Sequence, residues 1–369
     1  MPRDPYLIYQ VPNMNGGLNT FSDPTLLKDN ETPNCQNVDF DNPGKVTQRA
    51  GYERVGNEIN SSLAPLGFGN LRIQSSGSNY LVVKVSTTFY YLLSTATTTW
   101  TAITGVYNAS ESTLDVYNDR LYVYNPVDDL LEWTGSGAFT AYAAAPKGRF
   151  GKMFQNRNFI AGVTSNLSRL YYSVIGSATD FAGAGSGFIE VNKNDGFKVT
   201  GIGTSEGILL VHKSDGGVYQ VNFDSSSVPS VIKVAAYKGA LRHQTISNFE
   251  NASIYLSSDS VRTIGQMENF PESQRDGELS LNIRPDILAL ESTFTTLAAG
   301  TYANNKYYLS VPVNQTVYND TVFTYAYGVW SKYQNVYAYG FILWNGYVHF
   351  FDSRKAQLYR FNATVKTDD

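Results

Sequence analysis

Short apolar runs recur along the chain, each flanked by turn-forming residues. Seven of them begin at Tyr80, Arg120, Asn158, Gly207, Ser253, Lys306 and Gly346, so successive starts are 40, 38, 49, 46, 53 and 40 residues apart. Repeats of roughly 40–50 residues are typical of four-stranded propeller blades. The spacing therefore predicts about seven blades.

A second strand-like run follows each of these runs after a short turn, as residues 89–91 follow 80–83 and residues 130–133 follow 120–123. Two such runs joined by turn formers such as Asn125-Pro126 predict a β-hairpin. The hairpins are expected near residues 85, 126, 165, 213, 258, 316 and 352. Weaker runs before most hairpins and after several of them complete the strand order of one blade.

A twisted four-stranded sheet cannot bury both faces alone, and propeller blades solve this by packing face to face around an axis. We predict an all-β fold, a β-propeller of about seven four-stranded blades over residues 37–362, with a C-terminal tail at 363–369. A sandwich or solenoid of similar period is the alternative. The segment 37–55 is expected to supply a closing hairpin, with strands at 37–40 and 45–47, that completes the last blade beside residues 358–361.

Two stretches break the period. Residues 1–36 contain five prolines and no alternation, which predicts an extended N-terminal arm wrapped on a surface or on a neighbour. We expect this arm to lie outside the blades and to contact another subunit or protein. Residues 266–296 are expected to form an insertion. Within it, residues 284–291 are the predicted helix, because Pro285 would stand in its first turn.

Composition agrees with this architecture. The chain has 369 residues, of which 14% are aromatic and only 16% charged, a bias that favours strands over solvent-exposed helices. It has 28 basic and 32 acidic side chains, and the Lys and Arg residues form no clustered run, which argues against a dedicated nucleic-acid binding site. No apolar stretch is long enough to span a membrane as a helix, and no signal peptide is recognisable, so we expect synthesis in a cytoplasm.

Candidates for catalysis or metal binding are few. The three histidines, His212, His243 and His349, lie on or beside predicted strands, without a His-X-X-X-His spacing or paired carboxylates. Packing or surface exposure is therefore their expected role. Cys35 is the only cysteine, so no intramolecular disulfide can form, and it is expected to be either a small buried residue or an exposed thiol of the arm.

Two loops resemble ligand-binding motifs without completing them. The run 39–44 contains Pro43 and lacks the distal glutamate of a calcium loop, which favours a tight hairpin turn. The glycine-rich run 201–207 lacks the spacing and the following helix of a phosphate-binding loop, which favours a blade turn. Scattered loop carboxylates would support glycoside cleavage only if the fold brought two of them together: Asp128, Asp129, Asp215 and Asp224. We therefore predict no catalytic residue, no cofactor and no metal ligand.

Short phrases spread over most of the chain carry a family resemblance. The N-terminal ones are Asn15-Gly-Gly-Leu-Asn-Thr20, Gln36-Asn-Val-Asp-Phe-Asp41 and Arg49-Ala-Gly-Tyr52. Later ones are Leu170-Tyr-Tyr-Ser173, Asp180-Phe181, Ala252-Ser-Ile-Tyr-Leu-Ser-Ser-Asp259, Tyr307-Tyr-Leu309 and Gly328-Val-Trp-Ser-Lys-Tyr333. In this order they resemble the nozzle or tail-hub proteins of short-tailed bacteriophages, a family with propeller folds. Ser260 stands where that family often has glycine.

The resemblance implies a non-enzymatic structural protein of the virion tail, assembled in the host cytoplasm. It implies a homo-oligomeric ring, a hexamer, that contacts other tail or portal-adaptor proteins and extends the DNA-ejection channel below the portal. The net charge of −4 suits a conduit through which DNA passes without being retained. An arm outside the blades is the kind of element that binds neighbouring subunits in a ring.

Two other functions stay open on the sequence. A receptor- or glycan-binding propeller at the tail tip would use exposed aromatic side chains to stack on sugars, and the tryptophans are its candidates: Trp100, Trp133, Trp330 and Trp344. Packing inside the blades is the alternative role of these side chains. A propeller glycoside hydrolase is the third possibility, since the fold also hosts that chemistry.

Overall fold

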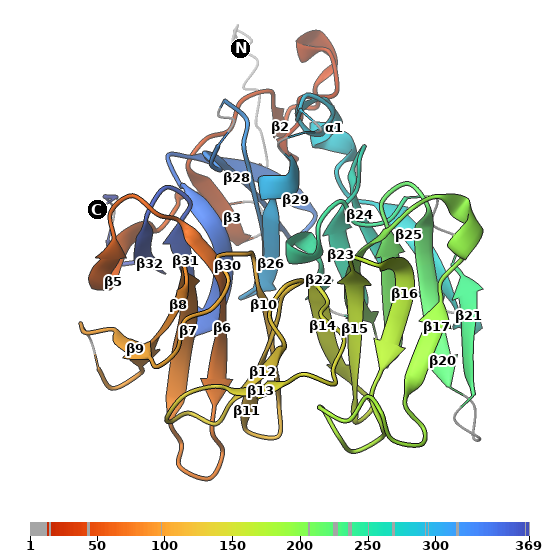
Figure 1. Ribbon diagram of the computed structural model, residues 1–369. Coiled ribbons are helices and arrows are strands. Elements are labelled where there is room, and N and C mark those ends of the chain that lie inside the picture. Colours follow the sequence, from red (N-terminus) through yellow and green to blue (C-terminus); the bar gives the residue numbers. More distant parts are fainter. Residues whose placement is uncertain are drawn as a thin grey trace, which may run out of the picture.

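Seven four-stranded antiparallel sheets surround a central axis, so the chain is a seven-bladed β-propeller, as the repeat predicts (Figure 1). Blades one to six each use four consecutive strands, whereas the seventh combines three C-terminal strands with one from the N-terminal part of the chain. The computed structural model describes residues 13–14, 16–42, 45–96, 98–205, 207–223, 228–234, 238–249, 251–267, 270–291, 293, 295–314, 317–365 and 367–368.

The strands fall into four sets by their position in a blade. The innermost are β6 (Pro65–Arg72), β10 (Thr113–Tyr117), β14 (Phe150–Phe154), β18 (Val199–Ser205), β22 (Ser247–Phe249), β26 (Ala299–Ala303) and β30 (Ala338–Trp344). The second are β7 (Asn79–Val85), β11 (Arg120–Tyr124), β15 (Arg157–Val163), β19 (Ile208–Lys213), β23 (Ala252–Leu256), β27 (Lys306–Val311) and β31 (Tyr347–Asp352). The third are β8 (Thr88–Leu93), β12 (Leu130–Trp133), β16 (Asn166–Tyr172), β20 (Gly217–Phe223), β24 (Val261–Met267), β28 (Thr321–Ala326) and β32 (Ala356–Asn362). The outermost are β9 (Thr101–Ile103), β13 (Thr140–Tyr142), β17 (Gly187–Glu190), β21 (Pro229–Lys233), β25 (Phe270–Glu278), β29 (Val329–Gln334) and β5 (Gly51–Asn60).

The other elements are short. The N-terminal segment holds β1 (Gly17–Leu18), β2 (Glu31–Thr32), β3 (Val38–Asn42) and β4 (Lys45–Gln48). Among the described residues one α-helix occurs, α1 (Arg284–Leu288). Single 3-10 turns are η1 (Pro24–Leu26), η2 (Lys193–Asp195), η3 (His243–Thr245), η4 (Leu281–Ile283) and η5 (Thr295–Leu297). No helix of the described residues is long and apolar enough to cross a membrane.

The core is divided among the junctions between blades. Over the described residues the buried apolar side chains form seven clusters, one at each junction. Neighbouring residues of one strand serve opposite junctions: Leu209 and Val211 of β19 pack toward blade three, whereas Ile208 and Leu210 pack toward blade five. Because both faces of a middle strand are buried, its sequence contains a run of apolar residues in place of strict alternation. This explains why the second and third strands carry the strong runs, and the seven predicted hairpins are these strand pairs.

Close packing near the axis depends on glycines of the innermost strands. A Cβ atom at Gly203 would lie 2.6 Å from Cγ2 of Ile246, and one at Gly201 would lie 2.5 Å from Cδ1 of the same residue. The glycine-rich run 201–207 was expected to form a blade turn, but most of it lies in the strand β18. Its glycines let blade five approach blade four, because any larger residue would collide with Ile246.

The seventh blade closes through a different N-terminal segment from the one predicted. β5 pairs antiparallel with β32, with Tyr52 opposite Phe361 and Arg54 opposite Tyr359. The hairpin expected to do this, at 37–48, forms a separate two-stranded sheet of β3 and β4. An outermost strand has one face toward solvent, so β5 carries many polar residues and lacks the apolar run that marks the other strands.

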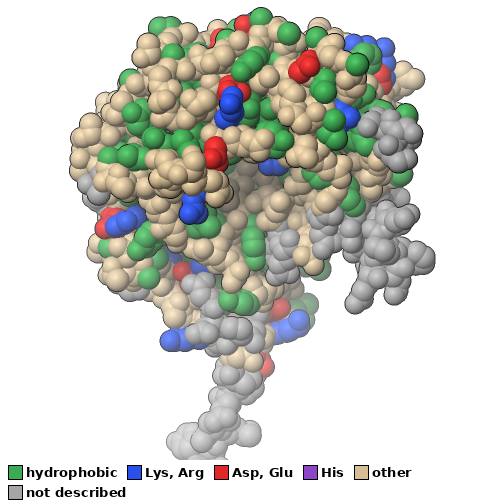
Figure 2. Space-filling view, turned by 90° about the horizontal axis from the view of Figure 1, so that it is seen from below, with side chains coloured by type: hydrophobic (Ala, Val, Ile, Leu, Met, Phe, Trp, Pro, Cys, Tyr) green, Lys and Arg blue, Asp and Glu red, His purple; other side chains and the backbone are tan. Residues whose placement is uncertain are grey.

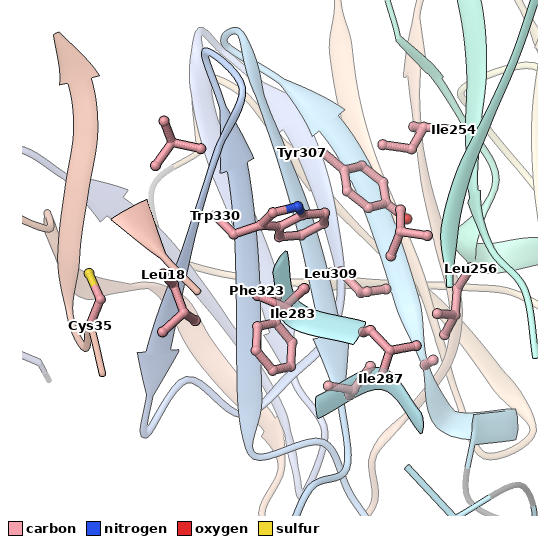
Figure 3. Packing of buried hydrophobic residues seen from close by; sticks show 14 of the residues in the cluster. Leu18, Cys35, Ile254, Leu256, Ile283, Ile287, Tyr307, Leu309, Phe323 and Trp330 are labelled. Carbon is pink, nitrogen blue, oxygen red and sulfur yellow. The ribbon is translucent and has the colours of Figure 1, made fainter. Parts of the chain in front are cut away.

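The N-terminal segment lies outside the blades, as predicted, but its described part packs on its own chain. Leu18 is 2% exposed and belongs to the cluster at the junction of blades five and six, with Trp330 among its other members (Figure 3). Gly17 has a φ of 61°, and a Cβ atom there would lie 2.0 Å from Cγ1 of Val329. The described part of the segment is thus wrapped on the propeller's own surface, and its contact with another subunit or protein stays a prediction. Residues 1–12 lie outside the described part of the chain.

The predicted insertion is shorter than expected. Residues 266–278 complete β24 and β25, so the irregular connection spans only 279–298. The predicted helix is present as α1, with Pro285 in its first turn, and it ends at Leu288. Ile287 of α1 packs with Ile283 into the same cluster as Leu18. The connection thus covers the junction of blades five and six.

Candidate functional site

The three histidines serve packing, and two of them, His212 and His243, are near enough for His243 to contribute to the lowered pKa of His212. His212 is fully buried, its Nδ1 accepts a hydrogen bond from the backbone N–H of Ala240 at 3.2 Å, and burial lowers its pKa to about 3. Burial also lowers the pKa of His349 to about 4. The ring of His243 stacks on Phe150 at a centroid distance of 5.1 Å. Among the described residues, no three His, Cys, Asp or Glu side chains come together as a metal site.

The loop carboxylates make separate contacts. Asp128 accepts a hydrogen bond from the side chain of Asn125 at 2.8 Å, and Asp129 pairs with Lys147 at 2.9 Å, both in blade two and its connections. Asp215 lies in blade four, two blades away from Asp128 and Asp129, and accepts a hydrogen bond from Ser258 Oγ at 3.2 Å. Within the described residues no contact joins these groups into an acid–base pair, and Asp224 lies outside the described part.

The tryptophans do not form an exposed sugar-stacking surface. Trp133, Trp330 and Trp344 are buried at blade junctions. The indole N–H of Trp330 donates to the backbone oxygen of Leu279 at 2.8 Å. Trp100 is half-buried and lies 5.9 Å from the ring of Phe351. Packing is therefore the role of the three buried tryptophans, which are not available to stack on glycans, and half-buried Trp100 also packs against blade seven.

The run that resembles a calcium loop anchors β3 to blade six. Asp39 is buried and pairs with Lys306 at 2.6 Å, and it also accepts a hydrogen bond from the hydroxyl of Tyr333. Both contacts go to Oδ1 of Asp39, so this carboxylate fastens β3 to the strands of blade six. The neighbouring Cys35 is buried, with Sγ 3.9 Å from Ser331 Oγ, and burial raises the pKa of its thiol. A raised thiol pKa disfavours the reactive thiolate.

A group of hydrogen-bonded side chains, Glu111, Arg242, Gln244 and Tyr339, crosses the propeller axis, and we call it the polar brace. No sequence motif predicted it. Glu111, just before blade two, accepts hydrogen bonds from Arg242, from Gln244 Nε2 at 2.9 Å and from the hydroxyl of Tyr339 at 3.3 Å. Arg242 and Gln244 precede blade five, and Tyr339 belongs to blade seven. Because blades two, five and seven lie on different sides of the axis, these contacts span it.

A buried lysine supports the loop that carries Glu111. Lys84 of β7 is fully buried, and its ammonium donates to the backbone oxygen of Ser110 and to Ser112 Oγ, each at 3.0 Å. Burial lowers the pKa of Lys84 to about 8. Two hydrogen bonds therefore hold residues 110–112 on either side of Glu111.

Beside the brace, a hollow of about 360 Å³ opens at the axis, on the face that carries the connections between blades. Its walls include Glu111, Arg149, Lys198, Arg242 and Gln244. A second space of about 190 Å³ continues along the innermost strands, beside Tyr339. Seen from below, the propeller is also hollowed near its centre, and its Lys, Arg, Asp and Glu side chains are scattered (Figure 2). The hollow beside Glu111 is thus the place where charged side chains from several blades converge.

Comparison with known proteins identifies the fold and no family. No family model matches the chain, and no curated protein matches it. A solved structure described as BBS1N in complex with ARL6DN is similar with a TM-score of 0.54 and 9% identity, over 85% of this chain and 97% of that one. The β-propeller domain of Cps50 (Swd1) from Myceliophteria thermophila is similar with a TM-score of 0.53 and 10% identity, over 84% and 98%. The computationally designed Ika8 protein reaches 0.51 at 8% identity, over 84% and 100%.

Proposed function

We propose that the chain is a non-enzymatic structural subunit of a bacteriophage tail, of the nozzle or tail-hub type. In this proposal a ring of its copies, six by the resemblance, extends the DNA-ejection channel below the portal and contacts neighbouring tail or portal-adaptor proteins. The observation that carries it is the ordered series of phrases, from Asn15-Gly-Gly-Leu to Gly328-Val-Trp, that resembles this family over most of the chain.

The N-terminal phrases of this series have defined packing roles. Gly17 and Leu18 anchor the segment on blade six. Arg49 is buried, and its guanidinium donates to Asn37 Oδ1 at 2.9 Å and to Asp368 at 2.8 Å, which joins the two ends of the chain. Tyr52 packs inside the closing sheet. Packing roles of this kind restrict which amino acids can stand at these positions. This supports the view that the resemblance of these phrases to the tail family is more than chance.

The brace at the axis bears on where DNA would pass. Glu111, Arg242 and Tyr339 occupy the centre of the propeller, so a duplex has no bore through a single copy. The proposed channel therefore runs between copies of a ring. The net charge of −4 suits such a wall, because the chain's 32 acidic side chains outnumber the 28 basic ones that could retain a polyanion.

Two observations favour a structural role over an enzymatic one. The scattered carboxylates Asp128 and Asp215 belong to different blades and make separate contacts. Burial keeps His212 and His349 neutral and uncharged at physiological pH, because their pKa values lie near 3 and 4. Neither pattern provides the paired acid and base of a hydrolase.

The test is to assemble virions without this chain and to image them by electron microscopy. The proposal predicts heads with an incomplete tail below the portal and loss of infectivity, with both restored when the chain is supplied in trans. Complete tails that fail to adsorb would overturn the proposal in favour of a receptor-binding role. Cleavage of a polysaccharide by the purified protein at enzyme-like rates would overturn it in favour of a hydrolase.

A further inference from the structure

The hollow beside Glu111 has a charge opposite to that of the whole chain. Three cations line it, Arg149, Lys198 and Arg242, against the single carboxylate of Glu111. Arg242 is paired with Glu111. Arg149 and Lys198 are exposed at the rim, and neither forms an ion pair with any described residue. A chain of net charge −4 therefore presents a recess of local charge +2, and a recess of one sign concentrates ligands of the other.

Two unsatisfied polar atoms lie in the same wall. Oε1 of Gln244 and Oγ of Ser110 are buried and have no hydrogen-bond partner among the described residues. A buried polar atom without a partner costs stability. An occupant that supplies N–H groups would relieve that cost once the side chains of Gln244 and Ser110 turn these atoms toward the hollow. Leu167, which is half exposed, and Pro126 add an apolar side to the hollow.

We propose that this hollow binds an acidic segment of another polypeptide. A glutamate or aspartate side chain meets Arg149 and Lys198, backbone N–H groups meet Gln244 and Ser110, and an aliphatic side chain packs on Leu167. Arg and Lys bind carboxylates through charge-assisted hydrogen bonds, which favours this chemistry over a neutral peptide. A recess of about 360 Å³ has the size of a small ligand site and holds only a few residues of a chain.

The geometry favours a peptide over DNA. Binding of a duplex requires cations spread along a surface track, where each neutralises one phosphate. Here the cations converge on one recess, and apolar groups such as Leu167 and Pro126, which offer nothing to a phosphate backbone, form part of its wall. The inference is independent of the proposed tail function, since the acidic partner is defined by chemistry and not by its origin.

Fluorescence anisotropy with a labelled octapeptide of alternating leucine and glutamate tests the site. The double variant Arg149→Gln/Lys198→Gln is expected to bind at least about tenfold more weakly than the wild type, because two charge-assisted hydrogen bonds are lost. The matched control is Arg72→Gln/Lys193→Gln, which removes two exposed cations outside the hollow. It should bind like the wild type. Glu111→Gln removes the competing carboxylate and should tighten binding several-fold, a gain that partial unfolding cannot produce.

Circular dichroism confirms that each variant is folded before binding is measured. Absence of peptide binding to the wild type at millimolar concentration overturns the proposal. Equal loss in the hollow variant and the control variant also overturns it, because the effect would then be a general charge effect. Tighter binding of a short DNA duplex or of an oligouronate than of the peptide, with the same dependence on Arg149 and Lys198, assigns the hollow to that ligand instead.

Discussion

Tyr52 lies directly opposite Phe361 in the sheet of the seventh blade, although 309 positions separate them in the chain, from 52 to 361. The ring of Tyr52 contacts those of Phe350 and Tyr359 edge to face, both at 5.2 Å, and its hydroxyl donates to the backbone oxygen of Asn335 at 3.1 Å. These contacts tie the N-terminal strand of the propeller to its last hairpin. β32 and β5 are held together in the seventh blade by non-covalent contacts alone, so loss of this packing should open the ring of blades there.

The first prediction follows from this closure. Tyr52→Ala is expected to lower the free energy of unfolding by about 3–5 kcal/mol, the usual cost of removing a buried aromatic side chain. Tyr327→Ala, at a residue that is 55% exposed, is the matched control and should change it by less than about 0.5 kcal/mol. Urea unfolding followed by tryptophan fluorescence measures both. Similar values for the two variants would mean that β5 does not hold the ring closed.

The sequence predicts the blades well because their signal is local. A strand buried on both faces reads as an apolar run, and a turn between two such runs reads as a hairpin, so the seven strand pairs are found from periodicity alone. β5 was missed because its outer face is solvated, and residues such as Arg54 and Glu58 interrupt its pattern. The 3-10 turn η3 likewise delays the start of β22 to Ser247.

The brace and the hollow are beyond the reach of sequence reasoning. Glu111 and Arg242 are separated by 131 positions and meet only because blades two and five face one axis. No local spacing announces such a contact, since it is made by the closure of the ring. The tryptophan candidates fail for a related reason, because an aromatic residue in a strand has the same sequence signature whether it is exposed or lies at a blade junction.

A second prediction concerns the N-terminal segment. Leu18 is 2% exposed, whereas Leu26 in the same segment is 77% exposed. Leu18→Ala is expected to lower the free energy of unfolding by about 2–5 kcal/mol through the cavity it leaves at the junction of blades five and six. Leu26→Ala should change it by less than about 0.5 kcal/mol. Equal stability of both variants, measured by urea unfolding, would mean that the packing of this segment does not contribute to the stability of the propeller.

A third prediction concerns acid. The pKa of His212 is near 3 and that of His349 near 4 in the folded chain, against 6.5 for a solvated histidine. Below pH 6.5 the unfolded chain therefore binds protons that the folded chain does not, and stability falls as the pH falls. Each histidine adds about 1.4 kcal/mol per pH unit to this slope, down to the folded pKa.

The measurement is urea unfolding of the wild type, His212→Gln and His349→Gln at intervals from pH 7.5 to pH 4.5. Each variant should lose less stability over this range than the wild type, whatever its absolute stability at pH 7.5. The comparison of slopes removes the separate cost of replacing a packed ring. Parallel slopes for all three proteins would show that these imidazoles are protonated in the folded state.

The last prediction concerns the path of DNA in the proposed tail. Glu111 and Gln244 meet across the axis, with Nε2 of Gln244 donating to Oε1 of Glu111 at 2.9 Å. If DNA passes between copies of a ring, the axis of each propeller can be locked without effect on ejection.

Virions that carry Glu111→Cys/Gln244→Cys, treated with a short bis-maleimide, should therefore keep the infectivity of treated virions that carry either single substitution. The single substitutions control for loss of the brace and for modification of a lone thiol, while Cys35 is buried and common to all three. The extent of cross-linking is read from the mobility of the denatured chain. A fall in infectivity that follows the cross-linked fraction would mean that the axis must open during ejection, and the channel would then have to be placed inside the propeller.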